Sequence, residues 1–206
     1  MKLRSVLLAA AGLAVGVTGV WEAKQANAAD LFFPVFVYRT GPYAPSGEPI
    51  ANGFRDYYAM LNKRDGGIEG HKVVTEECET KYNTKIGVEC YEKLKDKNGG
   101  AMLVSPYSTG LTYQLIPKAP VDKIAILSMG YGRTAAADGR VFPWVFNFPA
   151  TYWSQASSMV RYIGQEMGGL DKLKGKKITL VHFDHPGGRE PIPTLEILAE
   201  KYGFQL

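Results

Sequence analysis

The chain has 206 residues, of which 46% are hydrophobic and 21% are charged, and its formal net charge at pH 7 is +4. This composition excludes an intrinsically disordered chain and favours a globular protein with one good core or two small ones. The charge balance also argues against nucleic acid as a partner, because such proteins depend on a strongly basic surface.

The first 28 residues are typical of a cleaved signal peptide. Lys2 and Arg4 form a positive segment, residues 5–20 are an apolar run, and Ala26-Asn27-Ala28 is a small-residue cleavage site. The alternative is a membrane anchor, but a spanning helix needs roughly 20 apolar residues and this run is shorter and rich in Gly and Ala. We therefore expect export to a bacterial periplasm.

The first elements of the mature chain are a strand, a loop, a helix and a second strand. Residues 31–38 are continuously apolar, as in a strand buried on both faces of a parallel sheet. A loop rich in Gly and Pro follows at 40–47, and Gly66 and Gly67 end the next helix. That helix carries one apolar stripe, formed by Ile50, Phe54, Tyr57, Tyr58 and Leu61. A second strand begins at Val73 and ends near Cys78.

The same alternation then repeats. A helix is expected at 82–96, a strand at 101–104, a loop at 105–110 in which Ser108 or Thr109 caps the next helix, and a strand at 124–127. Strands alternating with helices at this rhythm predict a doubly wound α/β fold with a parallel sheet.

The character of the chain changes after Gly139. Residues 142–148 are interpreted as an aromatic strand that crosses into a second lobe, which gives a first lobe at 29–143 and the start of a second at 144–206. The second lobe is expected to hold a helix bearing Trp153 and Met167, a buried strand at 178–183 and a last helix at 192–202. One strand and two helices cannot cover both faces of a sheet, so we expect this lobe to be incomplete and the chain to be the front portion of a longer protein.

Cys78 and Cys90 are the only cysteines, and an exported setting favours their pairing. Cys90 shares a helical face with Ile86 and Leu94, so its side chain should point inward, towards the strand that ends near Cys78. The alternative is two buried free thiols. We expect a disulfide.

A small-molecule site is expected where loops follow the strands. The carboxyl ends of parallel strands gather at one edge, and the loops 41–47, 105–110 and 129–132 each bring a tyrosine to it. Tyrosine offers a flat wall and one hydrogen bond, and hydroxyls and free amides suit a carboxylate or amide. The alternative is that loops contain such residues for structural reasons. The expected ligand-binding residues are Tyr43, Tyr107, Ser108, Thr109, Gly130, Tyr131, Gly132 and Asp184.

Other chemistry has weaker support. Residues 130–135 match a dinucleotide-binding pattern but no amphipathic helix follows them. His182, Asp184 and His185 could ligate a metal, but alternation along the expected strand sends His182 into the covering helices. We expect Asp184 and His185 instead to be polar residues at the rim of a cleft. No nucleophile elbow, phosphate-binding loop or paired carboxylates stand out. We expect no catalytic residues, cofactor or metal, with an exported metal-assisted α/β enzyme as the rival hypothesis.

With these loops placed, the chain resembles the periplasmic solute-binding proteins of ABC importers, in the branched-chain amino acid binding family. The segments that carry this resemblance are Thr40-Gly41-Pro42 with Ser46-Gly47, Asn62 with Asp65-Gly66-Gly67-Ile68-Glu69-Gly70-His71-Lys72-Val73, Ser105-Pro106 with Ser108-Thr109, and Asp184 ahead of Gly188. The resemblance implies a monomeric two-lobe receptor that closes on a small solute and presents it to a membrane permease. A sensory domain of the same fold is the alternative.

Two departures from the family pattern bear on the solute. Tyr131 stands between glycines where a Ser or Thr would meet a carboxylate, and Pro186-Gly187-Gly188 stands where the family often has a tyrosine. The resemblance thus leaves an amino acid, another small carboxylate, an amide and an aromatic solute as expected ligands.

Overall fold

The computed structural model describes residues 29–129 and 132–206, so the segment 1–28, expected to be a signal peptide, lies outside the described residues together with Gly130 and Tyr131. The strands are β1 (Leu31–Val37), β2 (Val73–Glu79), β3 (Leu103–Val104), β4 (Ala125–Ser128) and β5 (Val145–Asn147). β1 pairs with β2, and β4 pairs with both β3 and β5, always in parallel. Parallel bridges from Phe32 to Ala101 and from Val35 to Ser105 join the two ladders, which gives the order β2-β1-β3-β4-β5.

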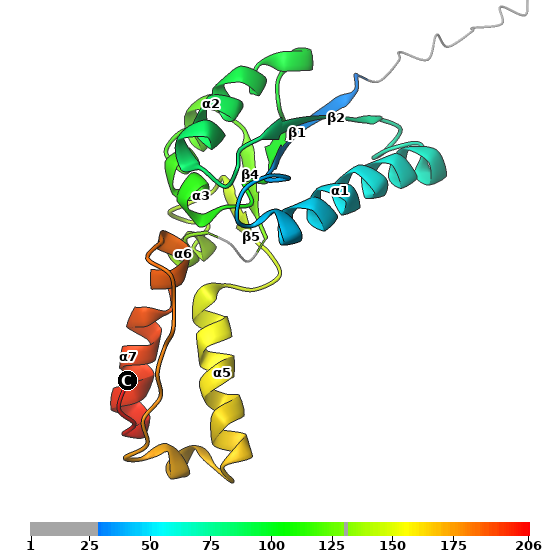
Figure 1. Ribbon diagram of the computed structural model, residues 1–206. Helices are drawn as coiled ribbons and strands as arrows, with labels where there is room; N and C mark the ends of the chain where they lie inside the picture. Colours follow the sequence, from blue (N-terminus) through cyan, green and yellow to red (C-terminus); the bar gives the residue numbers. More distant parts are fainter. Residues whose placement is uncertain (1–28, 130–131) are drawn as a thin grey trace, which may run out of the picture.

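Helices cover both faces of this sheet, as Figure 1 shows: α1 lies on one face, and α2 and α3 lie on the other. The helices are α1 (Ala44–Asp65), α2 (Thr84–Leu94), α3 (Thr109–Leu115), α4 (Ala119–Asp122), α5 (Tyr152–Glu166), α6 (Pro186–Arg189) and α7 (Ile192–Tyr202), with short 3-10 turns η1 (Lys97–Gly99), η2 (Thr134–Ala137) and η3 (Leu170–Leu173). Right-handed crossovers require this arrangement, because the chain moves one way from β1 to β2 and the other way from β2 to β3. The expected doubly wound parallel α/β fold is confirmed.

Three clusters of buried apolar side chains are found among the described residues. The largest lies between the sheet and α2 and α3, where Phe36, Tyr91 and Leu111 are each 1% exposed. The second is built around Val160, Leu173 and Leu195, from α5, η3 and α7. The third joins Val35 and Val37 of β1 to Ala51 of α1. α5 and α7 run side by side away from the sheet (Figure 1). Within the described residues, no helix has the length and apolarity needed to span a bilayer.

Two sequence expectations about the second half are wrong. The strand expected to begin the second lobe is β5, which pairs with β4 inside the first sheet. We therefore propose that the first lobe extends at least to Asn147. The second error is the buried strand at 178–183: these residues form no strand, and Val181 is 90% exposed. An apolar run becomes a buried strand only where neighbouring strands flank it, and the described residues provide none here.

The first helix begins earlier than its stripe indicates. α1 starts at Ala44, with Tyr43 as its N-cap residue and Pro45 in its first turn, so half of the expected loop 40–47 is helical. Proline is favoured in the first turn because its missing N–H has no helical partner to lose there. Gly47 allows this turn to approach β1, since a Cβ there would lie 2.0 Å from the Tyr38 carbonyl oxygen.

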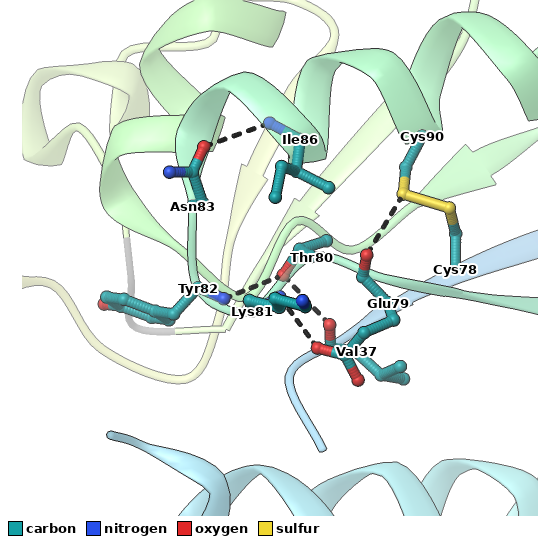
Figure 2. The surroundings of a disulfide bond; sticks show 9 residues. All are labelled: Val37, Cys78, Glu79, Thr80, Lys81, Tyr82, Asn83, Ile86 and Cys90. Atoms are coloured by element: carbon teal, nitrogen blue, oxygen red, sulfur yellow. Dashed lines mark hydrogen bonds between the residues drawn. A yellow bond between two sulfur atoms is a disulfide. The ribbon is translucent and has the colours of Figure 1, made fainter. Parts of the chain in front are cut away.

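The disulfide between Cys78 and Cys90 is confirmed (Figure 2). Cys90 is 3% exposed, as its helical face predicts. The bond joins the end of β2 to the middle of α2 and closes the turn between them. Inside this turn the Thr80 hydroxyl donates to the Val37 carbonyl at 2.9 Å and accepts the Tyr82 amide N–H at 3.2 Å. The β2–α2 turn is thus tied covalently to α2 and by hydrogen bonds to β1.

Two glycines of α1 form a matched pair for a stability test. Gly47→Ala should destabilise the fold by about 1–3 kcal/mol, because the new methyl group overlaps the Tyr38 backbone. Gly53→Ala should stabilise it by roughly 0.5–1 kcal/mol, because alanine favours the helix and its Cβ meets no atom within 4 Å. Urea unfolding measures both free energies. Equal effects of the two variants would contradict the close approach at Gly47.

Removal of the disulfide should lower the free energy of unfolding by about 3 kcal/mol, because a closed loop of this length restricts the unfolded chain. The measurement is urea unfolding with and without a reductant. The control is the double variant Cys78→Ala, Cys90→Ala, whose stability should not respond to the reductant. An unchanged midpoint for the reduced native protein would refute the expectation.

Candidate functional site

The strand order places the candidate site. In the order β2-β1-β3-β4-β5, the chain leaves β1 towards one face of the sheet and leaves β3 towards the other. The loops at these two carboxyl ends therefore diverge, and such a switch point is where ligands bind in open parallel sheets. Tyr43 follows β1, and Tyr107, Ser108 and Thr109 follow β3, so the switch point brings the two expected loops to the same edge.

Four aromatic side chains meet at this edge and form what we call the aromatic quartet: Tyr43, Tyr82, His185 and Phe183. Tyr43 and Tyr82 have ring centroids 4.6 Å apart, and Tyr82 lies 5.5 Å from His185. His185 is stacked on Phe183 at 5.0 Å, and Phe183 returns to Tyr43 at 6.2 Å. The four contacts form a closed cycle. Two members come from the loops after β1 and β2, and two come from the segment that precedes α6.

The quartet residues are held by local structure. Tyr82 has a left-handed backbone (φ +58°), which costs about 1 kcal/mol or more for such a side chain. Asn83 then caps α2 by accepting the Ile86 N–H (Figure 2). His185 caps α6, with its Nδ1 accepting the Gly187 N–H at 3.3 Å. Burial lowers the pKa of His185, which favours the neutral imidazole that this acceptor role requires.

Tyr107 lies behind the quartet. It is 6% exposed, its ring packs edge-on against Phe54 at 5.0 Å, and its hydroxyl donates to the Met129 sulfur at 3.6 Å. Tyr38 connects it to the site, with centroids 6.4 Å from Tyr107 and 5.1 Å from Tyr82. Tyr107 is therefore placed to support the quartet, and its role as a ligand contact stays a prediction.

Ser108 and Thr109 are buried at the start of α3. Ser108 caps this helix, as expected, by accepting the Leu111 N–H. The Thr109 hydroxyl is hydrogen-bonded to the Tyr152 hydroxyl at 2.8 Å, across to the first residue of α5. Gly187 packs beside both hydroxyls, since a Cβ at this position would lie 2.8 Å from the Tyr152 hydroxyl oxygen and 3.0 Å from the Thr109 hydroxyl oxygen. These polar groups are thus close to the quartet but are covered in this conformation.

The remaining expected residues lie at the rim. Asp184 is exposed and forms an ion pair with Arg189. Gly132 has φ +138°, and a Cβ there would lie 2.3 Å from the Ser128 hydroxyl oxygen, so a larger residue would disturb the end of β4. Gly130 and Tyr131 lie outside the described residues, and their contribution to binding stays a prediction.

The structure does not support a metal centre among residues 29–129 and 132–206, where no group of three His, Cys, Asp or Glu side chains converges. His182 is exposed and does not point into covering helices, contrary to expectation, because 178–183 is not a buried strand. Its Nδ1 lies 3.0 Å from the Phe183 carbonyl oxygen. His185 is instead a member of the quartet.

Sequence reasoning missed Tyr82, Phe183 and Tyr152 as parts of the candidate site, and it placed His185 only as a polar residue at the rim of a cleft. Tyr82 was assigned to a helix and Phe183 to a buried strand. Neither residue was therefore considered when ligand-binding residues were sought in the loops. The sequence did contain a signal for Tyr82, because this residue follows the end of β2 and lies between the two cysteines in the chain. Nothing local to Tyr152 marks it, because its partner Thr109 is 43 residues away.

Comparison with known proteins bears on this architecture. A family model described as "Periplasmic binding protein" matches residues 31–206. A search of curated proteins found no significant match. The matched family is one of binding proteins, which agrees with the expectation of a non-catalytic protein.

Solved structures agree with this family. A protein of the Pseudomonas fluorescens group, described as an ABC transporter permease, is 44% identical, has a TM-score of 0.76, and is matched over 86% of this chain and 43% of its own. A branched-chain amino acid ABC transporter protein from Thermus thermophilus with bound valine is 23% identical (TM-score 0.71; 86% and 44% covered). A solute-binding protein from R. palustris in complex with 4-hydroxybenzoate is 16% identical (TM-score 0.66; 86% and 45% covered).

The chain therefore spans less than half the length of these three structures while matching them over most of its own. The strand order, the helices on both faces of the sheet and the family match agree with one another. The chain belongs to the periplasmic binding protein family.

Proposed function

We propose that this chain is part of an extracytoplasmic receptor of an ABC importer, which binds a small solute at the switch-point edge and delivers it to a membrane permease. The observation that carries the proposal is the aromatic quartet, because its rings come from two parts of the chain that are far apart in sequence. Tyr43 and Tyr82 belong to the first lobe, and Phe183 and His185 belong to the segment after α5. Family membership supports the location outside the cytoplasm.

The quartet supports a mechanism of closure around the solute. The four rings contact one another and so cover part of their apolar faces, while Tyr43 and Phe183 remain 40% and 46% exposed. If the segment 183–187 moves away, these faces become exposed, and a solute that enters can take the place of the ring contacts. Binding then stabilises the closed arrangement only to the extent that the solute prefers it to the open one.

The chemistry of the site favours a flat solute with a polar end. The quartet provides aromatic faces, and the Thr109 and Tyr152 hydroxyls lie next to Gly187 at the inner side of the same segment. Hydroxyls that donate to a carboxylate or carbonyl would orient such a solute. An aromatic carboxylate, like the 4-hydroxybenzoate held by the R. palustris protein, fits this description better than valine does. Amides and amino acids are kept among the solutes to be tested.

A thermal-shift screen tests this proposal. The protein is heated with valine, leucine, phenylalanine, benzoate, 4-hydroxybenzoate and benzamide in separate samples. A ligand at 100 times its Kd should stabilise the fold by about 2.7 kcal/mol, and the aromatic carboxylates should give the largest shift. Stabilisation by valine alone would refute the aromatic class of solute but would still support a receptor. If no solute of any class stabilised the protein, the receptor function would be refuted.

Replacement of one quartet ring tests the location of the site. Tyr82→Ala should weaken binding of the ligand found in the screen by at least roughly fivefold, because an aromatic pair contributes about 1 kcal/mol. The matched control is Tyr162→Ala on α5, since Tyr162 is 62% exposed and lies outside the quartet. Isothermal titration calorimetry gives both affinities. Equal affinities for the two variants would exclude the quartet from the binding site.

A further inference from the structure

Glu190 lies where the segment that carries two quartet residues contacts the first lobe a second time. It directly follows α6 and precedes α7, so it lies five residues beyond His185 and seven beyond Phe183. Its side chain is partly buried. None of the binding chemistry proposed above uses this carboxyl group.

The backbone and the side chain of Glu190 are held by different parts of the protein. The backbone carbonyl accepts the Trp153 indole N–H of α5 at 3.1 Å. One carboxyl oxygen accepts the Tyr113 hydroxyl of α3, and the other accepts the Thr134 N–H of η2 at 3.1 Å. The backbone thus attaches the turn after α6 to α5, whereas the carboxyl group attaches the same turn to the first lobe.

The two contacts of the side chain require two acceptor oxygens. An ionised carboxyl group provides both, because its oxygens share the negative charge and each can accept a donor. Burial raises the pKa of Glu190, and the Thr134 N–H opposes this rise because a donor stabilises the carboxylate. The Tyr113 hydroxyl, as a second donor, acts in the same direction. Glutamine would offer one acceptor oxygen and would turn its NH₂ group towards the other donor.

These contacts complete the attachment of the segment 183–190 along the carboxyl edge of the sheet. The quartet joins this segment to Tyr43 and Tyr82, which follow β1 and β2. The Glu190 carboxyl group joins it to α3 and η2, which follow β3 and β4. The ion pair of Arg189 with Asp184 lies within the segment and so cannot attach it to the first lobe. The carboxyl group therefore holds the end of the segment that the rings do not reach.

We propose that Glu190 is a positioning residue for the solute site: its ionised carboxyl group fixes the segment 183–190 against the first lobe and thereby holds Phe183 and His185 in the quartet. The residue acts through these two rings and not by contact with the solute. The inference rests on the proposed function, because it takes the quartet as the solute site and this segment as the wall that moves.

NMR of the solute-free protein tests this role. Nuclear Overhauser effects (NOEs) are measured for two ring pairs that share His185. The pair with Tyr82 joins the segment to the first lobe, and the pair with Phe183 lies within the segment. Glu190→Ala removes both acceptor oxygens, so the ratio of the first NOE to the second should fall at least roughly twofold. Glu190→Gln should lower the ratio less, because it keeps one acceptor oxygen.

The matched control is Glu196→Ala, at an exposed position on α7, which should leave the ratio unchanged. Urea unfolding of the same variants separates positioning from general stabilisation. If Glu190→Ala lowered the unfolding midpoint but kept the wild-type NOE ratio in its folded state, Glu190 would be merely structural and the proposal would be overturned.

A second variant covers the case in which Glu190→Ala does not fold. Tyr113→Phe removes one of the two donors and should also lower the NOE ratio, and an unchanged ratio in this variant would overturn the proposal. Because no solute is present in these experiments, failure of the solute screen leaves their result unaffected. An unchanged ratio would in turn leave the quartet itself as the candidate site.

Discussion

The reversal of strand order between β1 and β3 is the constraint on which the rest of the structure depends. Neighbouring parallel strands whose crossovers leave in opposite directions cannot cover their common carboxyl edge with the same helix, and this edge is where open parallel sheets bind ligands. Tyr43 and the Ser108–Thr109 turn stand at this edge because they directly follow the two strands. The site is thus a consequence of topology, and its chemistry depends on which side chains the loops carry.

The disulfide contributes to the site as well as to stability. It joins β2 to α2 around the turn that carries Tyr82, whose left-handed backbone must be held by its surroundings. The Thr80 hydroxyl fastens the same turn to β1. A rigid Tyr82 is useful for recognition, because a ring that is already in place loses little conformational entropy when a solute or the opposite wall packs on it.

The opposite wall is held by weaker and more adjustable contacts. Phe183 and His185 lie in a segment without secondary structure, next to the four residues of α6. Its connections to the first lobe are ring contacts, the Thr109–Tyr152 pair and the Glu190 carboxyl. Contacts of this kind each contribute about 1 kcal/mol, so the proposed closure requires only small differences in free energy.

The sequence by itself determined the parallel α/β fold, the inward Cys90 and the Ser108 cap, because each depends on periodicity or on spacing within one element. It also indicated the switch-point loops that bear Tyr43 and Thr109. Only the tertiary structure decided that β5 belongs to the first sheet, that 178–183 is not a buried strand, and that Tyr82, Phe183 and His185 meet. Strand partners and ring contacts join residues far apart in the chain, and a local pattern carries no information about which distant neighbour is present.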